Sequence, residues 1–96
     1  MSPPTHVFIL PEDIGEEHVI IYWKLPQEGQ ESYIQARPVA VMDKNITFLV
    51  NNTDSFKIEP LIPGMTYEIG VATVTNGNRS ALNTVQCTLS KVFFKH

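Results

Sequence analysis

The chain has 96 residues, a length that suits one domain, because a single hydrophobic core commonly serves about 100 to 150 residues. Hydrophobic residues make up 43% of it and charged residues 18%, which is typical of a chain that folds around a packed core and excludes a disordered one. The net charge is −3 and the Lys and Arg residues are scattered, so no basic stripe is present to bind nucleic acid.

The sequence also argues against a membrane span and against disulfide or thiolate chemistry. The longest apolar runs, such as Val19 to Trp23, fall far short of the roughly 20 residues that a spanning helix needs. No signal-peptide pattern opens the chain, so Met1 and Ser2 are interpreted as residues added for expression. Cys87 is the only cysteine, which excludes an intramolecular disulfide, a CxxC redox pair and a thiolate zinc site.

Strand signals dominate the chain from its first residues. No segment of about eleven residues keeps an apolar helical period without a Pro, Gly or β-branched interruption. A short edge-type strand is predicted at Val7 to Leu10, because prolines flank it on both sides. An acidic turn at Glu12 to Glu17 follows. The second predicted strand, His18 to Lys24, alternates apolar residues and contains Trp23, the expected core residue.

The middle of the chain predicts three further strands. The third, Tyr33 to Val41, has an ambiguous pattern, and the residues alone leave open which of its faces is inward. Two short β-branched and aromatic runs, Ile46 to Val50 and Ser55 to Glu59, lie between turn-forming residues and are both predicted to be strands.

The last third begins with a proline-rich corner at Pro60 to Gly64. The strand Thr66 to Val74 then alternates most regularly, and we expect Tyr67, Ile69, Val71 and Thr73 to point inward. A tight turn within Thr75 to Ser80 leads to a final strand at Leu82 to Leu89. Seven short strands without a helix predict an all-β fold, a two-sheet antiparallel Greek-key sandwich.

Six residues carry a resemblance to a known family over nearly the whole chain. A tryptophan in the second strand is followed shortly by a proline, and a Leu, Pro-Gly and Tyr pattern precedes the sixth strand. These residues are Trp23, Pro26, Leu61, Pro63, Gly64 and Tyr67. The sequence resembles fibronectin type III domains, which are seven-stranded and immunoglobulin-like. The resemblance implies that the Tyr67 hydroxyl bonds a backbone group of the preceding corner and that Leu61 fills the core beneath it.

The stretch Tyr67 to Val71 points to one subgroup of these domains, since it is similar to repeats in the ectodomains of receptor-type protein tyrosine phosphatases. An immunoglobulin domain is the nearest alternative, but it normally bridges its sheets with two cysteines. We expect one domain over 1–96, with 1–4 and 90–96 as linker or as ends added for expression. The run Lys91 to His96 is left open as strand extension, linker or added sequence.

No constellation of residues points to catalysis, a metal or a cofactor. The histidines His6, His18 and His96 lack metal-ligand spacing, and the acidic turn lacks a calcium-loop pattern. Nucleophile-elbow, P-loop and dinucleotide motifs are absent from the sequence. Cys87 lies on the apolar face of the last strand, where a buried, inert thiol is expected. We therefore predict that the domain is not an enzyme and needs no cofactor.

Three Asn-x-Ser/Thr triplets indicate a secretory origin. Asn45, Asn51 and Asn78 are the candidate N-glycan acceptors. They place the domain in the extracellular part of a single-pass membrane protein, or in a secreted one. An intracellular structural member of the same family is the alternative.

Two functions from different classes remain open for such a module. The first is a structural spacer in a string of repeats. The second is a protein-binding surface, with Ile20, Tyr22, Asn76 and Arg79 as its candidate residues. For Ile20 and Tyr22 the alternative is that the first or last strand, including Phe93 or Phe94, covers them. The expected partners are proteins and neighbouring domains of the same chain, and the isolated domain is expected to be monomeric.

Overall fold

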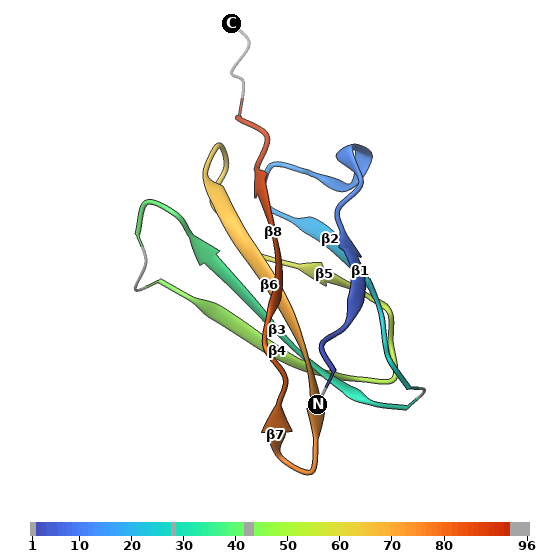
Figure 1. The fold of residues 1–96 in the computed structure, drawn as a ribbon. Coiled ribbons are helices and arrows are strands. Elements are labelled where there is room, and N and C mark those ends of the chain that lie inside the picture. The colour runs from blue at the N-terminus through green and yellow to red at the C-terminus, as the bar shows by residue number, and fades with distance from the viewer. Residues whose placement is uncertain (1, 28, 42–43, 93–96) are drawn as a thin grey trace, which may run out of the picture.

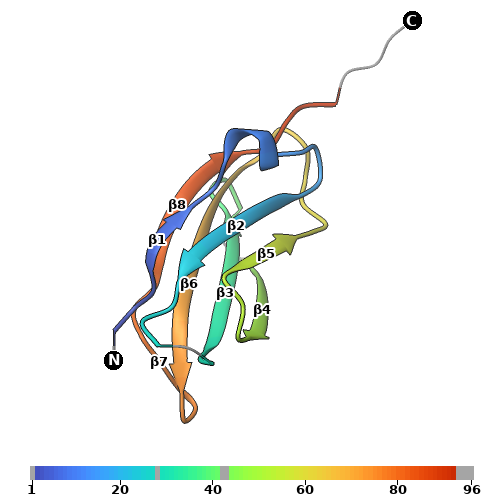
Figure 2. The same ribbon diagram turned by 90° about the vertical axis from the view of Figure 1, so that its right-hand side faces the viewer.

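Two antiparallel sheets face each other across one core in the computed structural model, which describes residues 2–27, 29–41 and 44–92 (Figures 1 and 2). The first sheet has the strand order β1-β2-β5, and the second has the order β4-β3-β6 with β7 and β8 both paired to β6. The strands are β1 (Thr5–Phe8), β2 (Val19–Lys24), β3 (Glu31–Pro38), β4 (Ile46–Asn51), β5 (Ser55–Ile58), β6 (Thr66–Thr75), β7 (Asn78–Arg79) and β8 (Asn83–Thr88).

The predicted fold class is confirmed, whereas the predicted count of seven strands needs a correction. The structure adds β7, a strand of two residues that falls inside the predicted turn. Asn76 and Gly77 have φ values of 51° and 80°, so they reverse the chain within two residues and let Thr75 pair with Asn78. One 3-10 turn, Pro11–Asp13, is the only helical segment among the described residues, where the acidic turn was predicted.

Every predicted strand differs from the structure by at least one residue at an end, and the first and third strands differ by two residues or more. The first strand is Thr5–Phe8, not Val7 to Leu10, because its register with β2 breaks between its ends, where His6 takes a φ of 54°. The third strand ends at Pro38, not at Val41. Proline has no N–H to continue the ladder, and the Val39 N–H makes the final bond to β6, 3.0 Å from the Thr66 carbonyl oxygen.

The core lies between the inward faces of the two sheets. In β3 the inward residues are Ser32, Ile34, Ala36 and Pro38, which resolves the face that the sequence left open. The inward alternation predicted for β6 is confirmed, since Tyr67, Ile69 and Val71 belong to the core cluster and Thr73 is fully buried. Trp23 is 3% exposed and its indole N–H donates to the Ser32 hydroxyl at 3.1 Å, so the core's largest side chain also has its polar group bonded.

The corner before β6 closes one end of this core. Leu61 and Tyr67 are each 3% exposed, and the Ile62 N–H donates to the Tyr67 hydroxyl at 3.0 Å. Gly64 has a φ of 75°, a conformation that favours glycine. Pro63, beside it, is half-buried. A backbone donor of the corner thus meets the tyrosine hydroxyl, the arrangement known as a tyrosine corner.

The strands β1 and β8 place the two ends of the described chain at opposite poles of the sandwich (Figures 1 and 2). Before β1, the Ser2 carbonyl accepts a hydrogen bond from the Thr73 hydroxyl at 2.7 Å, and Pro4 is buried. After β8, the Ser90 N–H donates to the Gly15 carbonyl at 2.9 Å. Among the described residues, no helix has the length and apolar character required to cross a bilayer.

Candidate interaction surfaces and glycan acceptors

The first candidate surface is the outer face of the β1-β2-β5 sheet, where Ile20 and Tyr22 are both half-buried. Phe8 of β1 stacks on Tyr22 with the ring centroids 5.1 Å apart, and Phe8 itself is 43% exposed. The Tyr22 hydroxyl donates to the Asp13 carboxylate at 2.7 Å, and this bond to an anionic acceptor raises the pKa of Tyr22 above its ordinary value. Phe93 and Phe94 lie outside the described residues.

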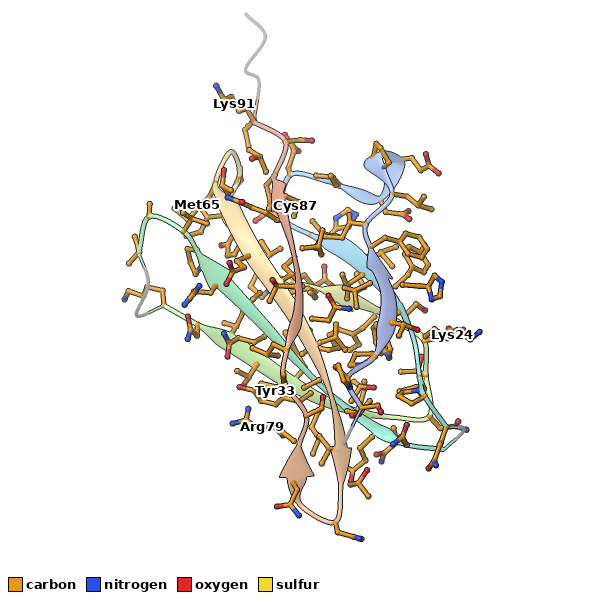
Figure 3. The ribbon with its side chains drawn as sticks, viewed as in Figure 1. Lys24, Tyr33, Met65, Arg79, Cys87 and Lys91 are labelled. Carbon is orange, nitrogen blue, oxygen red and sulfur yellow. The ribbon has the colours of Figure 1, made fainter. Side chains whose placement is uncertain are left out.

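The second candidate surface belongs to the other sheet. Asn76 and Arg79 are exposed on the β6–β7 hairpin at the end of the sandwich (Figure 1). The Arg79 guanidinium lies 4.1 Å from the centre of the Tyr33 ring, a cation–π contact (Figure 3). The four residues predicted to bind a partner therefore form two separate pairs on opposite sheets and do not make one surface.

Arg79 borders a hollow that the sequence analysis missed. It has a volume of about 410 Å³ and is lined by Gln35, Ala72, Arg79, Ser80 and Leu82. Ala72 faces outward and is buried, so its small side chain forms the floor of the hollow. The only sequence signal for this hollow is the outward direction of Tyr33 and Gln35. The pattern of β3 is ambiguous, so the sequence did not show that these two side chains point outward.

A larger groove of about 570 Å³ lies near the opposite sheet, between the end of β2 and the turn before β5. It is lined by Trp23, Lys24, Leu25, Gln27, Asn52, Thr53 and Asp54. Lys24 and Asp54 give its rim one charge of each sign, so the groove has no net preference for a charged ligand. The enclosed apolar walls that hold small molecules in most proteins are not found in this groove.

In the described part of the chain, the side chains that could bind a metal ion or act as a nucleophile are far apart or unreactive. No cluster of three or more His, Cys, Asp or Glu side chains is placed to hold a metal ion there. Burial raises the pKa of the Cys87 thiol to about 11, so the nucleophilic thiolate is scarce at neutral pH. His18 packs its ring against Gly15, where an added Cβ would lie 2.4 Å from the ring.

The three candidate glycan acceptors are all exposed. Asn45 directly precedes β4, Asn51 is its last residue, and Asn78 lies in β7 at the hairpin. The side chains at the third position of each triplet differ in exposure. Thr47 is exposed, whereas Ser80 is half-buried, and its hydroxyl accepts a hydrogen bond from the Thr73 N–H at 3.0 Å.

Comparison by sequence gives no relatives, since neither the models of known protein families nor the curated proteins match the chain. Comparison by structure gives many. The FN5 domain of Drosophila Lar is 26% identical with a TM-score of 0.72, and the match covers 95% of this chain and 100% of that one. The FN1–FN3 segment of chicken CNTN1 is 18% identical with a TM-score of 0.81, covering 95% of this chain and 33% of that segment.

Two further structures extend the comparison. A two-domain fibronectin type III segment of chicken tenascin is 17% identical with a TM-score of 0.79, covering 96% of this chain and 50% of that segment. A computationally redesigned β-sandwich protein is 19% identical with a TM-score of 0.80, covering 100% of this chain and 97% of that one. This chain thus spans a third to a half of the multidomain segments that it matches.

The two antiparallel sheets, with connections that cross between them after β2, β4 and β5, define an immunoglobulin-like Greek-key sandwich. Within this class, the tyrosine corner and the buried Trp23 are the features that the resemblance to fibronectin type III domains predicted. The matching structures include several domains of that type. The chain has the fibronectin type III fold.

Proposed function

We propose that this domain is a non-catalytic extracellular module that acts as a structural spacer within a string of repeats in a cell-surface protein. The fold supports the non-catalytic part, because fibronectin type III domains typically serve as binding or structural modules. A receptor with a cytoplasmic tyrosine phosphatase domain is the parent that the Tyr67 to Val71 stretch favours.

One observation carries the spacer role: β1 begins at one pole of the sandwich and β8 ends at the other (Figure 2). A neighbouring domain on each side would then be held apart by the full length of the module. Hydrogen bonds join both terminal segments to the body of the sandwich, from Thr73 to Ser2 at one pole and from Ser90 to Gly15 at the other. A pull on the two ends would therefore load the sandwich itself before any slack chain extends.

A tandem of identical copies, stretched between a surface and a force probe, tests this role. We expect each copy to unfold in one event that lengthens the tandem by roughly 300 Å, less the folded length, because each extended residue contributes about 3.4 Å. A spacer that resists force in this way behaves as one mechanical unit. Events that begin with a gain of only a few tens of Å would mean that β1 detaches first, and would contradict the proposal.

The extracellular part of the proposal is supported by the three exposed acceptors, Asn45, Asn51 and Asn78. They lie on the second sheet or its hairpin, where sugars would project into solvent without displacing core side chains. A glycan at Asn78 would also shield the hairpin tip, which favours a spacer over a binding role for that loop.

Protein binding is the second candidate function, and the Arg79–Tyr33 pair beside the hollow favours it. Such a pair presents an aromatic face and a cation together, a combination enriched where proteins meet. Adhesion of cells to surfaces coated with the domain tests this candidate. Arg79→Glu should lower the number of attached cells, and Lys24→Glu makes the same change of charge on the other sheet as a control. Equal adhesion by both variants would refute the second function.

A further inference from the structure

The sandwich has four sheet edges, and three of them carry features that prevent pairing with another chain. The edge strand β5 has four residues, a Lys57–Glu59 ion pair at 3.7 Å and Pro60 beyond it. The edge strand β1 is short and irregular, with a broken register and a positive φ at His6. Proline, charge, short length and irregular backbone are the usual protections of edge strands.

The third protected edge is that of β8, which lies beside β1 (Figures 1 and 2). The Asn83 side-chain amide of β8 donates to the Pro4 carbonyl at 3.0 Å, so the segment that leads into β1 is bonded to this edge. A second chain would have to displace that segment before it could pair with β8.

The fourth edge, β4, has none of these protections. Its six residues, Ile-Thr-Phe-Leu-Val-Asn, include no charge, no proline and no glycine. Leu49 on its outer face is 60% exposed, the largest value among the exposed large hydrophobic residues of the described chain. A run of high β propensity without charge or proline is the sequence type that pairs readily with another strand.

The hydrogen bonds around β3 show which backbone groups of β4 are free. The Val39 N–H bonds to the Thr66 carbonyl of β6. The backbone N–H and C=O groups of the odd-numbered residues of β3 therefore point toward β6, and those of the even-numbered residues point toward β4. The Asn52 N–H bonds to Gln30, which gives the same alternation from the other side. In β4 the odd-numbered residues therefore direct their N–H and C=O groups away from β3. They are Thr47, Leu49 and Asn51.

We propose that β4 pairs with β4 of a second copy of this chain, antiparallel about a twofold axis at Leu49. In this register Leu49 faces Leu49 of the second copy and Thr47 faces Asn51, so every outward N–H meets a carbonyl. Opposite residues lie on the same face of the sheet, as an antiparallel ladder requires. No charges meet, and the exposed leucines are buried against each other.

The acceptors Asn45 and Asn51 stand at the two ends of this edge, and sugars there would block the pairing. This regulatory part rests on the proposed extracellular function, whereas the pairing itself does not. The sequence alone predicts a monomer. The unprotected β4 edge means that the domain stays monomeric only while the sugars cover this edge. Loss of the sugars allows a second copy to pair with β4.

Sedimentation equilibrium of the unglycosylated protein, made in bacteria, tests the pairing. Between about 10 µM and 1 mM we expect the average mass to rise from 10.8 kDa toward twice that value, since a small interface gives weak association. Amide exchange followed by NMR gives the second readout. The amides of Thr47, Leu49 and Asn51 should gain protection as concentration rises, while those of Phe48 and Val50 are already bonded within the monomer.

Three variants separate edge pairing from other contacts. Leu49→Lys places two like charges together at the axis and should keep the protein at 10.8 kDa. Thr47→Pro removes a donor that points away from β3, so it should abolish pairing without breaking the internal ladder. Ile62→Lys is the matched control, because Ile62 is 52% exposed and lies at the corner before β6. It should associate like the parent.

Three results would overturn the proposal. They are a monomer at about 1 mM, association that survives both β4 variants, and protection at residues outside β4. The glycan part has its own readout in the protein secreted by mammalian cells. That protein should stay monomeric, and the double variant Asn45→Gln and Asn51→Gln should restore association. If the bacterial protein pairs and the secreted protein carries no sugars, the edge pairing stands and the extracellular proposal fails.

Discussion

Replacing Tyr67 by Phe tests the tyrosine corner that closes the core. The ring is 3% exposed and would keep its packing, so the change removes only the hydroxyl. The Ile62 N–H, now 3.0 Å from that hydroxyl, would lose its acceptor in a partly buried corner. An unsatisfied donor of this kind costs about 1–3 kcal/mol, and we expect a loss of that size in the free energy of unfolding.

Urea denaturation followed by Trp23 fluorescence measures the loss. With a slope of about 1 kcal/mol per molar urea, a loss of about 1–3 kcal/mol corresponds to a fall in the midpoint of roughly 1–3 M, with the slope unchanged. Tyr33→Phe is the matched control, since the Tyr33 hydroxyl has only a 3.4 Å bond to Gln35 and lies on the outer face. The control should change the free energy by less than about 0.5 kcal/mol. Equal losses in the two variants would refute the reasoning.

Three further predictions follow from buried groups. Ser32→Ala should lower the free energy of unfolding by about 1–3 kcal/mol in the same assay, because the Trp23 indole N–H loses its acceptor within the core; no loss would mean that the bond contributes nothing. Burial raises the pKa of Cys87 from 9.0 to about 11, so the stability from its neutral thiol is complete below pH 9 and is lost as pH rises through 11. Urea titrations at pH 8 to 11 should show this fall, and Cys87→Val should reduce it; identical pH profiles would contradict the assignment. Thiol labelling of folded protein at pH 8 should be about a hundredfold slower than in urea, and equal rates would show an accessible thiolate.

The sequence was sufficient for the fold because the signals that specify it are local. Alternation along β6 marked its buried face, and proline and glycine marked the corner before it. The short β7 was missed because two residues carry no periodicity. The start of β1 was predicted two residues too late, because nothing in the sequence shows that His6 adopts a positive φ.

The candidate surfaces were harder to predict because they depend on which strands become neighbours. Arg79 and Tyr33 are far apart in the chain, and only the pairing of β6 with both β3 and β7 brings them together. Tyr22, which the sequence analysis had grouped with Arg79, lies in β2 of the other sheet. Long-range register, which a single sequence does not reveal, decides both results.

The central claim is that this domain works outside the cell, and the mass of the secreted protein tests it most directly. The domain would be expressed through a mammalian secretory pathway and weighed before and after enzymatic removal of N-linked glycans. We predict a mass loss on removal that maps to Asn45, Asn51 or Asn78, the three exposed acceptors. An unchanged mass, with all three asparagines unmodified, would contradict the extracellular assignment and favour an intracellular structural role.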